Sequence, residues 1–443
     1  MTSAEGAETL SREQAAASPA AAARVRRRAV LSCMVGNLFE LFDFGVYGYF
    51  AAAIGRAIFP AADPYTSILG SFATYGVGFV MRPVGAMVLG SYGDRHGRKK
   101  ALVLTVTVMA TATGLTGLVP SYERIGIAAP LLLVLFRLLQ GFSTGGEWGG
   151  ATTFMIEYAP PGRRGLFGSL QQISTGLGQL CSISAAFLLN SWLDQPTLDD
   201  WGWRVPFLVG FLLAPVGYYL RSRVSETPAF ERNAAADRIT RSPLRTAFTT
   251  HRGAVATCFG LTIIWTVATF VFLTFMPTFA VQTLKIAPAT ALASTTLAAL
   301  VNLGFLPLAG MLSDRIGRKP LMMTAAAGFL LLAYPLFFLV TAQPSFATLL
   351  LAQAVGAFFY SMFNGVAPAA LCELFPTSVR YTALSVGYNG AVMIFGGFAP
   401  FIATFLIKET GNPVAPTYYV MACALVSLIV VARLKDRTRA PLQ

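Results

Sequence analysis

The sequence predicts an all-α membrane protein in which two pseudo-symmetric bundles of six transmembrane helices lie side by side. Of the 443 residues, 55% are hydrophobic and only 12% are charged, about half the charged share of a soluble domain. Twelve apolar stretches are long enough to span a bilayer, and a short basic motif occurs once in each half of the chain. Composition, span number and repeat therefore agree on one fold class.

The basic motif is the clearest sign that the chain is duplicated. The stretch from Gly90 to Lys100 reads GSYGDRHGRKK, and the stretch from Gly310 to Pro320 reads GMLSDRIGRKP, with Asp94 and Asp314 220 positions apart. A second pair, residues 157–164 and 373–380, begins with Glu and ends with Arg in both copies. Each basic motif lies between two apolar stretches, so we interpret it as a turn between antiparallel membrane helices.

The first half begins with a polar tail. Residues 1–28 are rich in Ala, Ser and Glu and end in a cluster of Arg, so we expect a disordered cytoplasmic tail. The following apolar run resembles a signal peptide, but its length of about 25 residues and the lack of a clear cleavage site favour a retained first helix. Residues 29–220 are predicted to form the N-terminal six-helix bundle, with spans near 29–55, 66–90, 100–120, 128–157, 164–192 and 203–220.

A polar segment separates the two bundles. Residues 221–252 carry seven Arg, and we interpret them as a cytoplasmic linker; the charges would equally permit contact with lipid headgroups. Residues 253–435 are predicted to form the C-terminal six-helix bundle, and residues 436–443 a cytoplasmic tail. The second set of spans lies near 253–281, 288–312, 320–341, 346–372, 380–407 and 415–434.

The distribution of basic residues predicts the orientation. The net charge is +13, but most Lys and Arg fall in the tails, the linker and the loops on one side of the predicted membrane. The loops on the other side hold only Arg56, Arg124, Arg204, Lys285 and Lys408. The positive-inside rule then places both termini in the cytoplasm of a multi-pass protein of a bacterial-type plasma membrane. The same distribution argues against a nucleic-acid partner.

No motif points to an enzyme or to a metal site. The five Cys are scattered through apolar runs, and no pair has the spacing of a metal or redox site. The sequence contains no zinc-protease motif, nucleophile elbow or phosphate-binding loop. We therefore expect no enzymatic activity, no metal and no cofactor other than the proton as a coupling ion.

Five charged residues lie well inside predicted spans of the first half: Glu40, Asp43, Arg82, Arg137 and Glu147. Each costs about 2.5–3.5 kcal/mol near the bilayer centre, so the five should face the bundle interior and largely pair with one another. Three acids against two bases leave one carboxylate over, and a buried carboxylate without a cation suits proton binding and release. We predict proton coupling, with a purely structural salt-bridge network as the alternative.

The second half offers neutral polar residues instead of charges. Its inward-facing candidates are Asn302, Tyr360, Asn364, Tyr388 and Asn389, and all of these except Asn389 are predicted to bind substrate. Asn302 falls 220 positions after Arg82, and Tyr360 and Asn364 are four apart on one helix face. Each of these residues, taken singly, is equally expected to be a helix–helix contact.

The motif G-x-x-x-D-R-x-G-R-K resembles the signature loop of the major facilitator superfamily of transporters, and the resemblance runs from about residue 30 to 434. The stretch from Gly36 to Gly48, GNLFELFDFGVYG, is similar to the metabolite:proton symporter family, which moves citrate, α-ketoglutarate, shikimate or proline and betaine. The resemblance implies alternating access. It implies substrate binding by Arg82 and coupling through Arg137 in the fourth helix, and it brings Tyr47 into the predicted substrate site.

The resemblance also implies a cytoplasmic gate that holds the two bundles together when the carrier faces outward. The predicted gate contains acidic and basic residues at the ends of helices. The positive-inside rule explains why Lys and Arg occur there, but it does not explain the acidic residues. The predicted gate residues are Asp94, Arg95, Gly97, Arg98, Glu157, Arg164, Asp314, Arg315, Arg318, Glu373 and Arg380.

These observations predict a proton-driven importer of a small organic anion such as a di- or tricarboxylate. Asp43 or Glu147 would carry the proton, with Glu40 beside Arg82 at the carboxylate. The nearest alternative substrate is a zwitterionic osmolyte such as proline or betaine; a transporter-like membrane receptor is a third interpretation. We expect a monomer whose partners are the solute, protons and the lipid bilayer.

Overall fold

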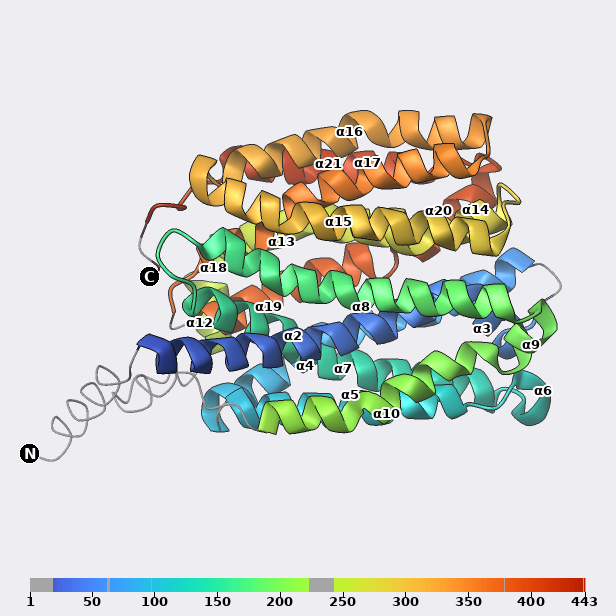
Figure 1. The fold of residues 1–443 in the computed structure, drawn as a ribbon, viewed down its shortest axis with the longest axis horizontal. Helices are drawn as coiled ribbons and strands as arrows, with labels where there is room; N and C mark the ends of the chain where they lie inside the picture. Colours follow the sequence, from blue (N-terminus) through green and yellow to red (C-terminus); the bar gives the residue numbers. More distant parts are fainter. Residues whose placement is uncertain are drawn as a thin grey trace, which may run out of the picture.

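The computed structural model describes residues 19–440 apart from 62–63, 97, 223–242 and 378, and also describes residue 442. Helices that run roughly parallel to one long axis form two groups, as Figure 1 shows. The predicted tail up to residue 18, most of the predicted linker and Gly97 lie outside the described residues.

The first group contains the helices of the N-terminal half. In chain order they are α2 (Pro19–Tyr49), α3 (Ala51–Ile58), α4 (Pro64–His96), α5 (Arg98–Leu118), α6 (Tyr122–Ile125), α7 (Ala128–Glu157), α8 (Arg164–Trp192), α9 (Gln195–Asp200), η1 (Gly202–Arg204) and α10 (Val205–Ser222).

The second group contains the helices of the C-terminal half. They are α12 (Pro243–Thr249), α13 (Arg252–Ala268), η2 (Thr269–Phe275), α14 (Met276–Gln282), α15 (Pro288–Ile316), α16 (Arg318–Ala342), α17 (Phe346–Asn364), α18 (Ala367–Cys372), α19 (Arg380–Ala391), η3 (Val392–Gly396), α20 (Ala399–Thr410) and α21 (Pro416–Arg433). Elements η2 and η3 are π-helical turns inside longer helices.

The length and composition of these helices suit a membrane. Within the described residues, nine helices are long and apolar enough to span a bilayer, and the bent pair α2–α3 makes a tenth. Two shorter apolar helices, Val103–Leu118 and Gly202–Leu212, occupy the positions of the third and sixth predicted spans. The two-bundle fold class predicted from the sequence is confirmed.

The first helix begins earlier than predicted. We expected residues up to 28 to be disordered, but α2 starts at Pro19. The run Ala20–Ala23 and the Arg residues after it have high helix propensity, and a Pro in the first turn costs no backbone hydrogen bond. The helix therefore extends at its N-terminal end beyond the apolar residues, into a polar segment whose composition suggested disorder.

The first helix of each half is interrupted at the same place in the repeat. Between α2 and α3 the chain bends by 64° at Phe50. In the second half, α13 passes into the π-helical turn Thr269–Phe275 before α14. The two interruptions lie near the end of the molecule that holds α3, α9 and α14, which we name the far end (right in Figure 1).

The other end holds the basic turns, α12 and α18, and we name it the basic end (left in Figure 1). Helices α4 and α7 pack closely because glycines allow their backbones to touch. A Cβ added at Gly141 would lie 1.6 Å from the carbonyl oxygen of Gly78, and one at Gly145 would lie 1.9 Å from that of Arg82. This packing fixes the segment of α4 that carries Arg82 against α7.

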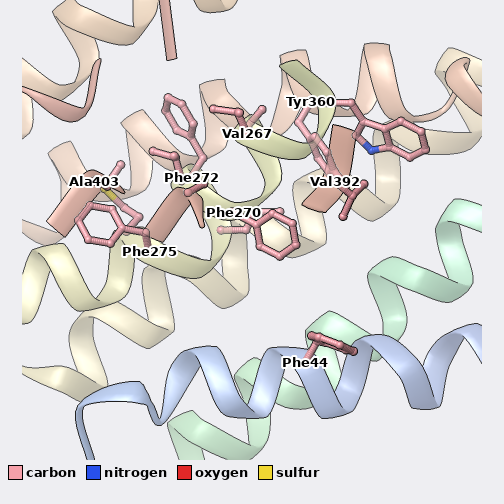
Figure 2. Close-up of a cluster of buried hydrophobic side chains, with 14 of the residues drawn as sticks. Phe44, Val267, Phe270, Phe272, Phe275, Tyr360, Val392 and Ala403 are labelled. Carbon is pink, nitrogen blue, oxygen red and sulfur yellow. The ribbon is translucent and has the colours of Figure 1, made fainter. Parts of the chain in front are cut away.

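One hydrophobic core continues across the boundary between the halves. Figure 2 shows Phe44 of α2 on one side and Phe270, Phe272 and Phe275 of η2 on the other. Phe79 connects them, because its ring centroid lies 4.9 Å from that of Phe44 and 5.3 Å from that of Phe270. Aromatic side chains at this boundary also contact a buried charge, since the Arg82 guanidinium lies over the rings of Phe44 and Phe79.

Candidate functional site

Glu40 of α2 and Arg82 of α4 form a buried ion pair. The Arg82 Nη2 to Glu40 Oε1 distance is 3.4 Å, and both side chains are almost fully buried. The guanidinium also lies over two rings, 4.2 Å from the centroid of Phe79 and 4.5 Å from that of Phe44. Its Nε has no hydrogen-bond acceptor among the described residues, so the guanidinium retains a donor that a ligand can use.

Asp43, one helical turn further along α2, forms a second buried pair with Arg137 of α7. Arg137 Nη1 lies 3.1 Å from Asp43 Oδ2. The other oxygen, Oδ1, accepts hydrogen bonds of 2.9 Å from Thr113 of α5 and from Gln140 of α7. Gln140 in turn accepts a 2.7 Å bond from Arg137. This closed network holds the carboxylate charge in place through four side chains from three helices.

The ring of Phe44 connects the two ion pairs. The guanidinium carbons of Arg82 and of Arg137 each lie 4.5 Å from its centroid. Both cations are therefore in cation–π contact with one aromatic ring, on the residue next to Asp43. A change in the position of one guanidinium changes the surroundings of the other.

Glu147 of α7 faces a different direction from Glu40 and Arg82. It lines a pocket inside the N-terminal half that Asp43 also lines, with Thr113 and Met109 of α5. The sequence predicted that the five buried charges face the bundle interior and largely pair with one another. The structure turns Glu147 toward α5 because it lies on the same face of α7 as Gln140 and Thr144, whereas Gly145 faces α4.

Tyr47 was predicted to contact substrate, and its position does not support that role. Its ring lies 4.4 Å from the Arg137 guanidinium carbon, and its hydroxyl donates a 3.2 Å bond to the carbonyl of Ser71. One helical turn separates it from Asp43, so it belongs to the Asp43–Arg137 network.

The predicted polar residues of the second half lie at helix contacts. Asn302 Oδ1 accepts a 2.9 Å hydrogen bond from Ser361, joining α15 to α17. Tyr360 and Asn364 are buried on one face of α17, and Asn364 Oδ1 has no partner among the described residues. Asn302 therefore acts in helix packing here, whereas Asn364 retains an unused acceptor inside the protein.

Tyr388 belongs to an aromatic cluster that crosses between the halves. Its ring is stacked on Trp148 of α7 with centroids 3.7 Å apart, and it lies 5.2 Å from Trp265 of α13. Trp148 and Trp265 are themselves 5.5 Å apart. Two nearby polar contacts join the same helices. Asn389 donates a 3.0 Å bond to the carbonyl of Gly145, and the Tyr381 hydroxyl donates to the carbonyl of Gly146.

Ion pairs close the boundary between the halves at the basic end. Arg380 Nη1 lies 3.0 Å from Glu157 Oε1, and Arg164 Nη1 lies 3.3 Å from Glu373 Oε1. Each pair joins an N-terminal residue to a C-terminal one. We name these four residues the latch.

The second basic turn is attached to the latch. Arg318 contacts Glu373 at 3.1 Å and Asp314 at 2.8 Å. Asp314 accepts hydrogen bonds of 2.8 and 3.0 Å from the backbone N–H groups of Gly165 and Leu166 at the start of α8, where a carboxylate is favoured by the helix dipole. Gly317 has a φ of +98°, as the predicted turn requires.

Other predicted gate residues are placed differently or lie outside the description. Arg315 is exposed, whereas Arg318 in the same turn is buried. The side chains of Asp94, Arg95 and Arg98 lie outside the described residues, as does Gly97.

The segment after the last helix contacts the same place. Asp436 Oδ2 accepts bonds of 2.9 and 3.3 Å from the N–H groups of Arg318 and Lys319, capping α16. Partial burial raises the pKa of Asp436, but the hydrogen bonds from Thr438, Lys319 and Arg318 outweigh it and hold the pKa below the ordinary carboxyl value. Asp436 is therefore ionised, and this cap persists, throughout the neutral pH range.

The boundary is also closed at the far end. The Tyr49 hydroxyl at the end of α2 donates a 3.1 Å bond to the carbonyl of Leu273 in η2. Beyond this contact lies a pocket of about 550 Å³ between the halves, lined by residues that include Phe50, Asn190, Thr278 and Gln282. With both ends closed, the ion pairs and the aromatic cluster lie in an occluded interior.

Sequence reasoning missed the aromatic residues of the site. Trp148 follows Glu147 directly, and Phe44 follows Asp43, so adjacency to an intramembrane charge was an available signal. Trp265 had no such signal, because an indole in an apolar run is usually part of the core.

Comparison with known proteins agrees with this architecture. The family model described as "Sugar (and other) transporter" matches residues 29–242, and the model described as "Major Facilitator Superfamily" matches residues 269–443. The citrate-proton symporter of Klebsiella pneumoniae is 37% identical over 424 residues, covering 96% of this chain and 95% of that protein. The proline/betaine transporter of Escherichia coli (strain K12) is 35% identical over 430 residues, covering 94% and 85%.

Solved structures share the fold. A partially occluded inward-open structure of the xylose transporter XylE from E. coli superimposes with a TM-score of 0.76 at 18% sequence identity, covering 93% of this chain and 98% of that chain. A complex of the proton:xylose symporter XylE with 6-bromo-6-deoxy-D-glucose gives a TM-score of 0.78, also at 18% identity, covering 95% and 98%. Because its relatives are more than 30% identical over nearly the whole chain, and because the family model matches, this protein belongs to the major facilitator superfamily of transporters.

Proposed function

We propose that the chain imports a small organic anion together with protons across a bacterial plasma membrane by alternating access. The observation that carries the proposal is the arrangement of two buried Arg–carboxylate pairs in contact with one aromatic ring, next to the boundary of the halves. The basic end is the cytoplasmic end. The citrate-proton symporter named above supports this class of substrate.

Arg82 is the proposed anion-binding residue. Its partner Glu40 lies 3.4 Å away, a loose contact for a charge-assisted hydrogen bond. A carboxylate of the solute would replace Glu40 on the guanidinium and use the unpartnered Nε for a second, parallel bond. Asn364, with its unused acceptor, would bind a hydroxyl or protonated carboxyl from the other half.

Asp43 is the proposed proton carrier, with Arg137 as its counter-charge. When Asp43 binds a proton, Arg137 loses its ion-pair partner 3.1 Å away. The released guanidinium shifts its contact with Phe44, and this alters the surroundings of Arg82 on the same ring. Glu147, which lines the same pocket as Asp43, would take part in the proton transfer.

A zwitterion such as proline or betaine is the second candidate, and one observation favours it. Trp148, Trp265 and Tyr388 form an aromatic cluster from both halves, and such clusters attract ammonium groups through their π faces. The carboxylate of such a solute would bind Arg82 while its ammonium group contacts the aromatic cluster. The Glu40 carboxylate would then balance the positive charge of the ammonium group.

Transport by the purified protein in proteoliposomes tests the proposal. An inward proton gradient should drive accumulation of labelled citrate or α-ketoglutarate above equilibrium, and an uncoupler should abolish it. Accumulation of betaine or proline alone would select the zwitterion. Binding of a solute without any flux would support a receptor instead of a carrier.

Arg82→Gln tests the binding residue. Because the neutral side chain cannot form two charge-assisted bonds to a carboxylate, affinity should fall by about tenfold or more, which corresponds to at least about 1.4 kcal/mol. The measurement is the shift in melting temperature with increasing ligand. Arg124→Gln, in an exposed loop at the far end, is the matched control, and equal affinity in both variants would refute the role of Arg82.

A further inference from the structure

The pocket lined by Asp43 and Glu147 lies wholly within the N-terminal half. Its empty space, counted together with space open to the surroundings, is about 420 Å³, and its walls come from α2, α5, α7 and α10. The residues lining it are Gly36, Phe39, Phe42, Asp43, Val106, Met109, Ala110, Thr113, Glu147 and Gly210. No lining residue belongs to the second half, and neither Glu40 nor Arg82 is among them.

The pocket therefore reaches the proton-carrying residue from the side opposite the boundary between the halves. Thr113 of α5 lines the pocket and donates a 2.9 Å bond to Asp43 Oδ1. On α7, Thr144 lies against Met109, another lining residue. The boundary side of α7 is occupied by Trp148 and its stack with Tyr388.

The pocket extends from Asp43 toward the basic end. Gly36 precedes Asp43 by seven residues on α2, and Val106 precedes Thr113 by seven on α5, which starts at the basic end. Seven helical residues span roughly 10 Å. On α7, which ends at the basic end, Glu147 lies seven residues beyond Gln140 in the same direction. The two carboxylates thus lie at successive depths along one cavity.

The charges around this cavity are few. On α7, Glu147 lines the pocket and Arg137 pairs with Asp43. On α2, the neighbouring ionisable residues are Glu40 before Asp43 and Tyr47 after it. Tyr75 and Arg82 approach the same network from α4. The residues of α5 and α10 that line the pocket are not ionisable.

We propose that protons leave Asp43 for the cytoplasm through this pocket, by way of Glu147 and water, and not past Arg82, where the solute is proposed to bind. This inference rests on the proposed function. One proton passes from the Asp43 carboxyl to water or to the Glu147 carboxylate and then to the cytoplasm. No other group is oxidised, reduced or lost.

The separate route keeps the proton away from the boundary that the latch opens and closes. The latch closes the boundary between the halves, but no latch residue lines the pocket. Since alternating access moves the halves as rigid bodies, a cavity within one half keeps its walls during that motion. Its apolar lining admits water next to carboxylates but disfavours a charged solute.

Filling the pocket tests the route. An added Cβ at Gly210 would lie 3.5 Å from Phe42 and Thr113, an ordinary contact distance, so Gly210→Val occupies the cavity without a clash at Cβ. Ala110→Leu fills it from α5. The matched controls are Gly304→Val, where an added Cβ meets nothing within 4 Å, and Thr111→Leu, an exposed position next to Ala110.

Two fluxes are measured in proteoliposomes: solute exchange without a gradient, and proton-driven uptake with its accompanying proton flux. We expect both filled variants to retain exchange, and to lose proton-driven uptake by about tenfold or more, whereas the controls retain both. Normal uphill uptake in the filled variants overturns the route. Loss of exchange as well also overturns it, because the pocket would then serve the carrier cycle itself.

A chemical probe separates this result from failure of the proposed function. Dicyclohexylcarbodiimide adds to a protonated carboxyl in an apolar site and forms a stable N-acylurea, which mass spectrometry locates. We expect labelling of Glu147 or Asp43 in the wild type and its loss in Ala110→Leu; undiminished labelling in that variant contradicts the inference. If the wild type shows no proton-driven uptake of any solute, the proposed function fails instead.

Discussion

Phe44 is the residue through which the two ion pairs of the site contact one another. Its ring lies 4.5 Å from both guanidinium carbons and is almost fully buried. Each cation–π contact contributes about 0.5–2 kcal/mol, more when the pair is shielded from water. A ring between two cations is thus a candidate for the physical connection between proton binding and solute binding.

Replacement of this ring by an aliphatic side chain should weaken coupling more than binding. In Phe44→Leu, both cation–π contacts are lost, so we expect proton-driven accumulation to fall by about tenfold while solute exchange continues. Phe44→Tyr keeps the π face and is the matched control. The ratio of uphill uptake to exchange in proteoliposomes is the measurement, and an unchanged ratio in Phe44→Leu would exclude the connection.

At this scale the sequence predicts which residues are charged but not which of them pair. The cost of burying Glu40, Asp43, Arg82 and Arg137 predicted that they would meet one another, and they do. The choice of partner depends on how α2, α4 and α7 are rotated, which close glycine packing decides. The same rotation of α7 turns Glu147 toward the pocket and away from the boundary between the halves.

At the scale of elements, the interrupted first helix of each half determines how the far end closes. Tyr49 stands immediately before the bend at Phe50, and its hydroxyl bonds to Leu273 inside the π-helical turn. A π-helical turn changes the hydrogen bonding of its carbonyls, and such turns are frequent at functional sites. The two interruptions therefore meet as one contact between the halves.

Removal of the Tyr49 hydroxyl should loosen this contact while keeping the ring in place. For Tyr49→Phe we expect faster hydrogen exchange at the amides of 269–275, because the bond to the Leu273 carbonyl, which contributes about 0.5–1.5 kcal/mol, is lost. The 3.3 Å bond that the hydroxyl accepts from Gln179 is lost with it. Tyr122→Phe, on the short helix α6, is the control. Equal exchange in the two variants would show that the far end is held closed by other contacts.

The sequence predicts a helix well when the helix is defined by a long apolar stretch. It predicts bends and helix starts poorly, because these depend on local backbone geometry. The long spans were predicted from hydrophobicity alone, since a membrane helix must satisfy its own backbone. The bend at Phe50 contains no proline, the usual signal of an interruption. Pro277 follows the turn Thr269–Phe275 by two residues, but a proline alone does not predict a π-helical turn. The start of α2 at Pro19 was missed because helix propensity there is not accompanied by apolar residues.

At the scale of the whole molecule, duplication produces two halves whose boundary is closed at both ends. The latch pairs connect residues more than 200 positions apart, and both come from the second repeated motif. An ion pair that forms only when the basic end is closed stabilises the closed state relative to the open state by the free energy of the pair. Weakening one pair should therefore shift the carrier toward the state open at the basic end.

Glu157→Gln keeps the shape of the side chain and removes its charge. We expect the backbone amides of Gly165 and Leu166, which donate to Asp314 across the boundary, to exchange about tenfold faster, which corresponds to about 1.4 kcal/mol. Hydrogen-exchange mass spectrometry of the start of α8 is the measurement. Glu123→Gln, on an exposed loop helix, should leave these amides unchanged; the same rate in both variants argues against the latch.

The overall duplication could be predicted because a repeat is a property of the sequence. The four latch residues could be predicted because the second repeated motif and the family resemblance indicated them. The role of Asp314 as a cap on α8 could not, since it depends on a helix start from the other half. The contribution of Asp436 was also missed, because the segment after the last apolar span carries no pattern that indicates a contact.

Asp436 and its neighbour Arg437, which lies 3.4 Å from the carbonyl of Glu373, attach the end of the chain to the machinery that opens and shuts. A fluorescent protein fused behind Gln443 would thus be attached a few residues from these contacts, and we expect its polarisation to change when the latch opens. An affinity handle meant to be silent belongs at the amino end instead.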